Sequence, residues 1–387
     1  MAKLWVMAVY DPLAVERLTR YKDIARFITS DAQTLLLRPR DGTRVWIAGG
    51  TGPSTSSLRM MQAQRGGTAE IPICFRLDFD RREQHIWQPL WMVSLEEERL
   101  RFVGSVPTEF EADEDWLDHR PTLPHEQPLF FEHSWQTAVR HIQNEIARGT
   151  LRKAVLTRQI EMWHTHAWPA HEVAAALLHA SAGTSVFAHH WHGGVVWIGA
   201  SPEILYQREG RQVVVDSLAG TRRMLMEGDS FTAKDHVEQQ LVTDYLVEVL
   251  TPLCEHVNVS PVSRRRADDL EHVYTQVTGV LRHGVGDDEL LGVLHPTPAV
   301  CGAPRARAME LIQALEPQPR ELYSGVLGYS TGHATTALVV LRCAKLQDST
   351  ARLYGGAGIV AGSDPELEFA ECGWKMDIMR RALLELT

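Results

Sequence analysis

The sequence predicts a mixed α/β protein whose strands pair mainly antiparallel. Two observations lead to this fold class. Strand-like segments follow one another across short turns, at residues 199–202 and at Glu209-Gly210, and consecutive hairpins build antiparallel sheet. Segments with helical spacing precede and follow these strands. With 387 residues, 44% of them hydrophobic, the chain is long enough to bury a large core.

The N-terminal part, up to about Arg101, predicts short strands and turns. Apolar runs such as Leu35–Leu37 and Val45–Ala48 are separated by Gly and Pro, which interrupt regular structure. The segment Glu111–Pro128 then combines six acidic residues with three prolines. We expect this segment to be a boundary or a surface loop.

In the rest of the chain, apolar periodicity predicts three helices and a series of strands. The helices are Ser134–Gly149, the segment Val237–Leu250, and Pro365–Leu386, where Ser363 and Glu366 form a capping-box pattern. The strands are Lys153–Ile160, Val195–Ile198, Glu203–Gln207, Gln212–Leu218 and the nearly continuous apolar run Ala337–Ala344.

The composition excludes several classes of protein. Acidic residues outnumber basic ones by 49 to 39, and the only compact basic run is Arg264–Arg266, so we expect neither nucleic acid nor an anionic membrane as a partner. The five cysteines are widely spaced and contain no Cys-x-x-Cys pair, which indicates neither a disulfide framework nor a zinc ribbon. No apolar stretch approaches the roughly 20 residues of a membrane span. We therefore expect a soluble, cytoplasmic protein.

Two predicted helices carry carboxylates three positions apart, Asp235 with Glu238 and Glu368 with Glu371. This spacing puts each pair on one helix face. If the two faces met across a cleft, their oxygen ligands would suit Mg²⁺, which favours carboxylates, water and substrate oxygens. Solvated helix surfaces explain the same pattern, and Lys375 would then form an ordinary surface ion pair with Glu371.

Three further features could belong to a site or to ordinary structure. Arg342 interrupts an apolar strand, where it needs a carboxylate partner from the protein or from a substrate. Lys153 and Glu203 each begin a strand beside a loop, a common position for surface charges and for catalytic groups. Residues Tyr354–Gly358 predict a glycine-rich turn before the last helix, either a plain turn or one whose N–H groups hold an anion.

Together, these segments resemble the chorismate-utilising enzymes, and within that family the isochorismate synthases. The resemblance covers about residues 130–387 and rests on several motifs in matching order and spacing. These motifs are Lys153-Ala-Val-Leu-Thr-Arg158, Gly199-Ala-Ser-Pro-Glu-Ile-Leu205, Leu218-Ala-Gly-Thr-Arg222, His295-Pro-Thr-Pro-Ala299, Gly356-Ala-Gly-Ile-Val360, Ser363-Asp-Pro-Glu366 and Glu368-Phe-Ala-Glu371.

The resemblance implies a specific architecture. Two antiparallel-rich β-sheets should face each other, with helices packed outside and the site in the central cleft. Residues 1–125 are then expected to be a variable N-terminal portion of the same α/β body, and residues 126–387 the chorismate-binding catalytic region.

The resemblance also implies a reaction, the conversion of chorismate to isochorismate. Water adds at C2 of the cyclohexadiene ring while the C4 hydroxyl leaves and the double bonds migrate. Lys153 is implied as the base that activates water, and Glu203 as the acid that protonates the leaving hydroxyl. These roles require a lowered pKa for the lysine and a raised pKa for the glutamate.

Because chorismate is a dianion, the resemblance implies groups that bind both of its carboxylates. Mg²⁺ on Glu238 and Glu371, supported by Asp235 and Glu368, is expected to bind the ring carboxylate. The other implied contacts are Arg342, Lys375 and the Gly356 backbone to the enolpyruvyl carboxylate, Gly220 and Thr221 to the ring carboxylate, and His295 on the side of the leaving hydroxyl.

Sister reactions on this scaffold are distinguished by few positions. Aminodeoxychorismate synthases carry a nucleophilic lysine where this chain has Ala219. Anthranilate synthases carry Asp-Leu-Gly-Arg-Asn-Asp where residues 242–247 read Val-Thr-Asp-Tyr-Leu-Val. Both reactions are therefore disfavoured, and no obligatory glutaminase subunit is expected.

Two alternatives stay open. Salicylate synthases keep the lysine and the glutamate and add pyruvate elimination, and a catalytically silent paralogue could bind a dianion or a partner protein. We expect a monomer or a homodimer, and siderophore, menaquinone or salicylate production could each use the product.

Overall fold

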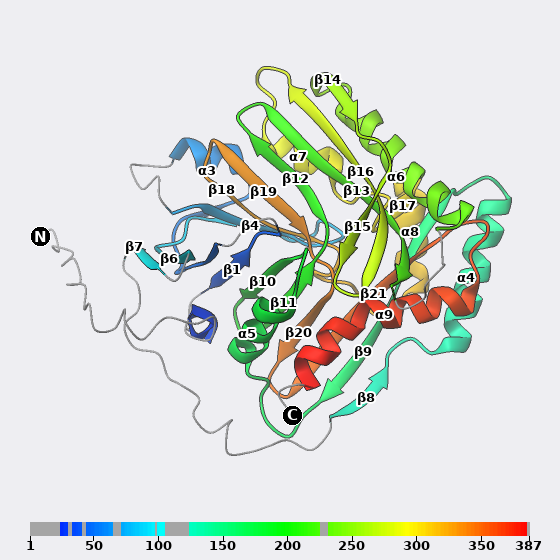
Figure 1. Cartoon of the computed structure of the whole chain (residues 1–387), viewed down its shortest axis with the longest axis horizontal. Coiled ribbons are helices and arrows are strands. Elements are labelled where there is room, and N and C mark those ends of the chain that lie inside the picture. The colour runs from blue at the N-terminus through cyan, green and yellow to red at the C-terminus, as the bar shows by residue number, and fades with distance from the viewer. Residues whose placement is uncertain are drawn as a thin grey trace, which may run out of the picture.

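The computed structural model describes residues 24–384, except 30–32, 41–43, 65–70, 97–98, 105–123 and 225–230. Two large β-sheets face each other, with helices on their outer sides (Figure 1). Every strand pair within the described ranges is antiparallel. The predicted fold class and the two-sheet arrangement are confirmed.

The two sheets each combine strands from before residue 105 and after residue 124. The eleven-stranded sheet runs in the order β17 (Gly302–Ala303), β9 (Lys153–Trp163), β21 (Thr350–Ile359), β20 (Cys343–Gln347), β11 (Val196–Ser201), β10 (Ser185–His190), β1 (Thr34–Arg38), β2 (Val45–Gly49), β6 (Trp91–Glu96) and β7 (Arg99–Gly104), with β8 (His125–Pro128) beside β9. The ten-stranded sheet runs in the order β14 (Cys254–Val259), β16 (Leu270–Leu281), β13 (Gln212–Arg223), β12 (Ile204–Glu209), β19 (Ala334–Val339), β18 (Val326–Ser330), β4 (Ile73–Leu77), β5 (Gln84–Trp87) and β3 (Ser54–Thr55), with β15 (Ser263–Ala267) beside β16.

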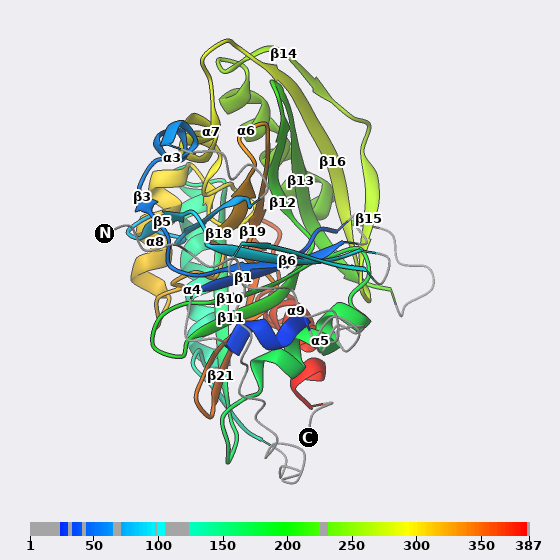
Figure 2. The ribbon, with the colours of Figure 1, turned by 90° about the vertical axis from the view of Figure 1, so that its left-hand side faces the viewer.

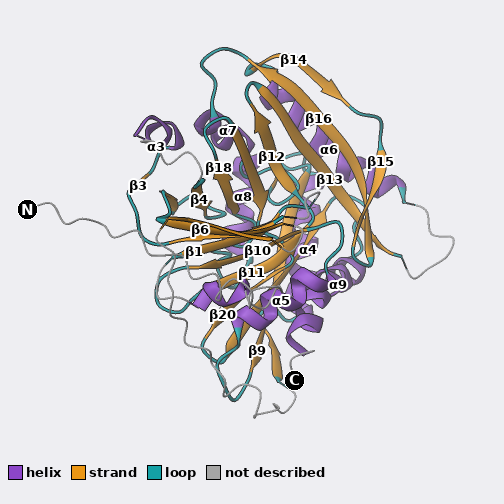
Figure 3. Cartoon of the chain, turned by 60° about the vertical axis from the view of Figure 1, so that its left-hand side comes forward, coloured by secondary structure: helices purple, strands orange, loops and turns teal. Residues whose placement is uncertain are grey.

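Helices cover the outer faces of both sheets. The eleven-stranded sheet is covered by α4 (Glu132–Ala147), α5 (Ala170–Ala180), α8 (Arg305–Leu315) and α9 (Pro365–Leu384), and the ten-stranded sheet by α6 (Ala233–Leu250), while η1 (Arg26–Thr29) lies beside α5 and α3 (Leu58–Gln64) beside α7 (Asp287–Leu294). Figure 3 shows α5 and α9 together on one side and α6 along β13 and β16 on the other. No helix in the described part of the chain is long and apolar enough to cross a membrane.

The core consists of buried apolar side chains in three layers, one under each set of helices and one between the sheets. Strand β1 illustrates how the sequence builds these layers. Leu36 faces the helices, whereas Leu35 and Leu37 face the second sheet, because successive side chains of a strand point to opposite faces. Figure 2 shows that β1, β10 and β11 of the eleven-stranded sheet run across the view, whereas β13 and β16 of the ten-stranded sheet run up it.

The periodic elements after Ser134 are largely as predicted, including α4, α6 and α9 and the strands β9, β11, β12 and β13. The predicted hairpin turn at residues 199–202 is wrong, because β11 continues to Ser201 and β12 belongs to the other sheet. The buried face of α6 differs from its most apolar positions, since Val237 is exposed and Glu238 is buried. The predicted boundary at Glu111–Pro128 lies mostly outside the described residues, and β8 begins at His125.

The prediction of one strand over Ala337–Ala344 is wrong, because two strands, β19 and β20, replace it and the backbone changes direction at Arg342. Strand β19 belongs to the ten-stranded sheet and β20 to the eleven-stranded sheet. Arg342 lies between them in the left-handed region, with φ of 50°, a conformation that interrupts a strand. The apolar run therefore supplies two short strands and a crossing between the sheets.

Two predictions near the last helix are also wrong. Residues Tyr354–Gly358 form part of β21 and not a turn. Glycine is required there because a Cβ atom at Gly355 would lie 2.2 Å from the Cys372 carbonyl oxygen of α9. The cap of α9 is Asp364, whose Oδ1 accepts from the N–H groups of Glu366 and Leu367, whereas the Ser363 hydroxyl accepts from Val360.

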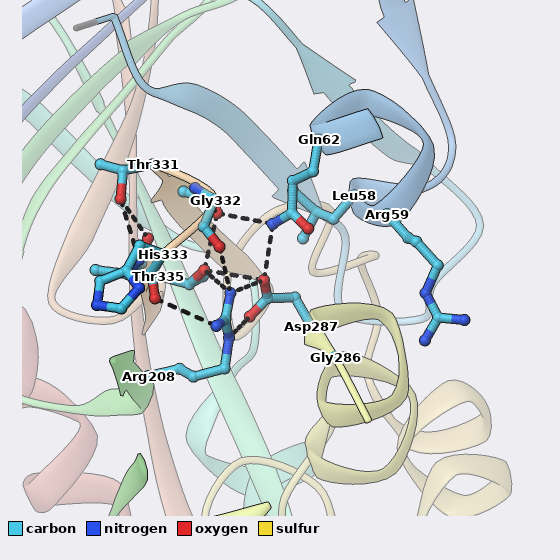
Figure 4. A network of polar contacts seen from close by, with 12 residues as sticks. Leu58, Arg59, Gln62, Arg208, Gly286, Asp287, Thr331, Gly332, His333 and Thr335 are labelled. Carbon is cyan, nitrogen blue, oxygen red and sulfur yellow. Dashed lines mark hydrogen bonds and ion pairs between the residues drawn. The ribbon is translucent and has the colours of Figure 1, made fainter. Parts of the chain in front are cut away.

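A buried polar network fastens α7 to the ten-stranded sheet (Figure 4). The Asp287 carboxylate accepts hydrogen bonds from Arg208 Nε at 2.8 Å and Nη2 at 2.7 Å, from Thr335 Oγ1 at 2.9 Å and from Gln62 Nε2 at 3.0 Å. A buried carboxylate is tolerated in a protein interior when it is paired and hydrogen-bonded in this way. None of these four residues lines the cavity described below, so the network is structural.

Candidate active site

A cavity with walls from both sheets contains many of the predicted site residues. Its empty volume is about 610 Å³, including the part open to solvent. The lining includes Glu203, Gly220, Thr221, Glu238, Arg342, Gly356 and Lys375 from the predicted set. Elements far apart in the sequence, β13, β16, α6, β21 and α9, therefore meet at this cavity.

Lys153, the first residue of β9, lies directly behind the cavity wall. Its side chain is 0% exposed, and Nζ lies 3.0 Å from Glu238 Oε1 of α6. This close approach depends on a glycine in β21, because a Cβ atom at Gly358 would lie 2.0 Å from the Glu238 oxygen and 2.8 Å from Lys153 Cε. Apart from this ion pair, Nζ has no hydrogen-bond partner among the described residues. The amine therefore retains N–H groups for contact with another polar molecule.

Glu203 lies directly before β12, in the segment that crosses from β11 to β12, and is 3% exposed. Burial raises the pKa of this carboxyl to about 8, and the negative charge of Asp216 adds to the shift, while Lys153 and Lys375 oppose it. The carboxyl is therefore protonated at neutral pH and able to donate a proton. This is the state that the implied acid role requires.

The raised pKa of Glu203 leads to a prediction about the pH dependence of turnover. If Glu203 must donate a proton, activity requires its protonated form, which is lost as the pH rises through about 8. We expect kcat to fall about tenfold for each pH unit above this value. A pH profile of kcat checks this, and a rate that stays constant to pH 10 would contradict the acid role.

Three carboxylates from α6 and α9 gather beside the cavity, and each is paired with a lysine. Glu238 pairs with Lys153, Glu371 Oε1 lies 2.7 Å from Lys375 Nζ, and Glu368 forms an ion pair with Lys234. Burial alone would raise the pKa of Glu238, but the positive charges of nearby lysines outweigh it and lower that pKa.

The chemistry of this carboxylate group fits Mg²⁺. The donors are oxygen only, as Mg²⁺ prefers. Glu368 also shows the repulsion that a divalent cation would relieve: burial and the negative charge of Glu371 raise its pKa to about 7, although Lys234 opposes the shift. As the side chains stand, no three His, Cys, Asp or Glu residues in the described ranges are arranged to hold a metal ion. The lysine partners would have to move aside.

Asp235 lies at the N-terminus of α6 and takes part in its cap. Its carboxylate accepts from the backbone N–H of Thr232 at 2.7 Å and from the Thr232 hydroxyl at 2.8 Å. It does not line the cavity, but its Cβ atom packs against Gly220, where a Cβ atom would lie only 2.8 Å away. Asp235 therefore caps the N-terminus of α6 and packs that end of the helix against β13.

Arg342, His272 and Thr221 form a hydrogen-bonded chain along the cavity wall. Arg342 Nη2 lies 2.8 Å from His272 Nε2, and His272 Nδ1 lies 3.2 Å from Thr221 Oγ1. Because burial and the charges of Arg342 and Lys375 lower the pKa of His272 well below its usual value, the imidazole is neutral. A guanidinium can only donate, so Nε2 accepts, and Nδ1 donates to the Thr221 oxygen. The threonine hydroxyl hydrogen is then free to point into the cavity.

Lys375 brings a second cationic group to the cavity. Its Nζ donates to the Gly356 carbonyl oxygen at 2.8 Å and to Glu371 at 2.7 Å. The cavity therefore presents Arg342 and Lys375 as positive groups that can attract a carboxylate. The Tyr323 and Tyr354 rings, stacked with centroids 5.0 Å apart, complete this side of the lining.

His295 does not reach the cavity. It is buried at the C-terminal end of α7, and burial lowers the pKa of its imidazole to about 3. Ala299 and Val300, which follow it in the same segment, do line the cavity. The segment thus contributes to the site through its later residues.

Sequence reasoning missed His272 and Tyr323. His272 occupies an inward position in β16, and Tyr323 lies just before β18. Neither stands in a local pattern that differs from ordinary core positions. His272 is recognised only from the pairing of β13 with β16, which places it beside Thr221.

Comparison with known proteins supports a common origin over most of the chain. A family model described as chorismate binding enzyme matches residues 106–384. Isochorismate synthase DhbC of Bacillus subtilis (strain 168) is 32% identical over 305 residues, which are 74% of this chain and 76% of that protein.

Two solved structures extend the similarity to the fold. One, described as 2,3-dihydroxybenzoate-specific isochorismate synthase DhbC from Bacillus anthracis, has a TM-score of 0.79 at 28% identity and covers 95% of this chain and 100% of that chain. The menaquinone-specific isochorismate synthase MenF from Escherichia coli has a TM-score of 0.79 at 24% identity, covering 93% of this chain and 91% of that chain. The chain belongs to the chorismate-binding enzyme family.

Proposed function

We propose that this chain is an isochorismate synthase that isomerises chorismate to isochorismate in a Mg²⁺-dependent reaction. The observation that carries the proposal is the buried carboxyl of Glu203 on the cavity wall, with the buried amine of Lys153 directly behind that wall; burial raises the pKa of the carboxyl to about 8. An acid and a base at one cavity are what an exchange of hydroxyl groups needs.

In the proposed mechanism, two proton transfers accompany the allylic rearrangement of the ring. Lys153 first releases to solvent the proton that its ion pair with Glu238 holds, and the free amine then accepts a proton from water as the oxygen forms a bond to C2. The double bonds shift toward C4, the C4–O bond breaks, and Glu203 gives its proton to the departing hydroxyl, which leaves as water. Lys153 then carries an extra proton and Glu203 lacks one, and exchange with solvent restores both groups.

The proposed binding mode separates the two carboxylates of the substrate. Arg342 and Lys375 would attract the enolpyruvyl carboxylate, and the hydroxyl of Thr221, oriented by His272, would donate to the ring carboxylate. Glu238, Glu368 and Glu371 would hold Mg²⁺, which supplies positive charge to the ring carboxylate when bound.

A product assay with the metal varied tests the proposed function. Purified protein is incubated with chorismate in Mg²⁺, in excess EDTA, and in EDTA followed by excess Mg²⁺, and the products are identified by proton NMR and by salicylate fluorescence. We expect isochorismate in the first and third mixtures and a loss of at least about 100-fold in the second. Salicylate as the main product would assign the chain as a salicylate synthase, and no turnover in any mixture would favour a silent paralogue.

A further inference from the structure

Asp216 is a buried carboxylate that is absent from the cavity wall but contacts the residue that follows Glu203. It occupies the middle of β13 and is 3% exposed. Four donors surround it: the backbone N–H of Ile204 at 3.2 Å, Arg40 Nη1 at 2.6 Å, Arg265 Nη1 at 3.1 Å and Tyr274 Oη at 2.9 Å. These partners stabilise the buried carboxylate, as in the Asp287 network, but Asp216 differs from Asp287 in its contact with Ile204, the residue that follows Glu203.

The segment that carries Glu203 needs side-chain support. Strand β11 belongs to one sheet and β12 to the other, so residues 202 and 203 cross between sheets and belong to neither strand. Pro202 also lacks an N–H group. The backbone of Glu203 is held by Val339 of β19, whose N–H donates to the Glu203 carbonyl oxygen at 3.2 Å, and by Ser201 Oγ, which accepts from the Glu203 N–H at 3.3 Å. The residues on either side, Pro202 and Ile204, are held by contacts from outside the two strands.

Arg40 and Asp216 supply contacts on both sides of Glu203. Arg40 Nη1 donates to the Pro202 carbonyl oxygen at 3.0 Å as well as to Asp216, and Asp216 accepts from Ile204. Arg40 comes from the loop after β1, in the part of the chain before residue 106, where the family model begins to match. The N-terminal part of the chain thus reaches the residue proposed as the acid.

We propose that Asp216, held by Arg40 and Arg265, is a positioning residue for Glu203 that fixes the crossing at residues 202–204 and directs its negative charge at the Glu203 carboxyl. This inference rests on the proposed function of Glu203 as the acid. It also assigns a role to Arg40, and so to the N-terminal part of the chain, in the reaction.

The charges around Glu203 give this arrangement an electrostatic consequence. Asp216 on β13 raises the pKa of Glu203, whereas Lys153 on β9 and Lys375 on α9 lower it. The remaining charged or titratable groups that line the same cavity are Glu238 on α6, His272 on β16, Arg342, Tyr323 and Tyr354. Removing the charge of Asp216 should therefore lower the pKa of Glu203, and removing its counter-ion Arg40 should raise it.

The test compares Asp216→Asn, Arg40→Met and the matched control Asp287→Asn. Asp287 is an equally buried aspartate, also 3% exposed and bound by an arginine, but it lies away from the cavity. The titration of Glu203 is followed by NMR of protein labelled with carbon-13 in the glutamate carboxyl groups, with the signal assigned by its loss in Glu203→Gln. The pH profile of kcat is recorded for each variant.

We expect Asp216→Asn to move the Glu203 titration and the alkaline fall of kcat to lower pH by about 1 unit. Arg40→Met should move both in the opposite direction, and Asp287→Asn should move neither. A Glu203 titration that is the same in all three variants would overturn the inference. If Asp216→Asn does not fold, the upward shift in Arg40→Met carries the test, and its absence overturns the inference.

The NMR titration separates this inference from the proposed function. Wild-type protein that converts no chorismate would refute the proposed function, whatever the titration shows. If the wild-type protein is active but the Glu203 titration is unchanged in Asp216→Asn and Arg40→Met, only the positioning role is refuted.

Discussion

Replacing Lys153 with alanine is expected to reduce the conversion of chorismate by at least about 1,000-fold, because the variant has no base to take the proton from water. Chorismate binding should survive, since Lys153 lies behind the wall and outside the cavity lining, while Arg342 and Lys375 remain in it. Turnover is measured by product NMR, and binding by calorimetry with the inactive variant.

The alanine variant also removes a buried charge from beside Glu238, so stability must be followed separately. Leaving one partner of a buried ion pair uncompensated costs about 3 kcal/mol, which thermal unfolding would reveal. Lys153→Arg keeps the positive charge but places there a guanidinium that does not release its proton at neutral pH. We expect it to be inactive as well, and activity in either folded variant would reject the base role.

A matched control for these variants is Lys345→Ala. Lys345 lies in β20 of the same sheet, and its Nζ forms an ion pair with Glu321 at 2.6 Å outside the cavity lining. This variant should retain wild-type turnover. Because this variant also loses an ion pair, it tests whether the loss of any paired lysine from this sheet reduces activity.

Replacing Glu203 with glutamine is expected to lower kcat by about 100- to 1,000-fold and, unusually for an interior substitution, to stabilise the fold at alkaline pH. The loss of activity follows from the loss of the proton donor. The stability gain follows from the raised pKa: between pH 4.5 and about 8 the folded state keeps a proton that the unfolded state releases. Wild-type stability therefore declines as the pH rises through this window.

Denaturant unfolding at pH 5 and pH 8 measures this effect. The glutamine variant should gain stability relative to wild type on going from pH 5 to pH 8, by a few kcal/mol. Glu209→Gln, at the exposed end of β12, the strand that follows Glu203, serves as the control and should show neither the gain in stability nor the loss of kcat. A variant that remains fully active, or one whose relative stability does not change with pH, would contradict the environment described for Glu203.

The sequence was most informative where periodicity is local. The helix α4 and the hairpin from β12 to β13 follow patterns that apolar spacing and turn residues determine on their own. The break at Arg342 could not be predicted in this way, because a left-handed residue within an apolar run leaves no mark on hydrophobic periodicity. The strand at Tyr354–Gly358 was missed because its glycines serve the close approach of α9, which is a tertiary requirement.

In the site, too, features set by local spacing could be predicted, whereas features set by tertiary contacts could not. The spacing of three residues identified the carboxylates on α6 and α9, but it gave no sign that lysines from β9 and α6 would pair with them. Asp216 and Arg40 were missed for a related reason. Their contact with the crossing at residues 202–204 depends on the packing of two sheets and on residues far apart in the chain.

The most direct test of the proposed chemistry is the origin of the new hydroxyl oxygen in the product. Chorismate of natural isotopic composition is converted in water enriched in oxygen-18, and the isochorismate is isolated and analysed by mass spectrometry and carbon-13 NMR. Addition of water activated by Lys153 and departure of the C4 hydroxyl protonated by Glu203 predict one solvent oxygen in each product molecule, bonded to C2. A product that retains the original oxygen, with none from solvent, would contradict the roles assigned to both residues.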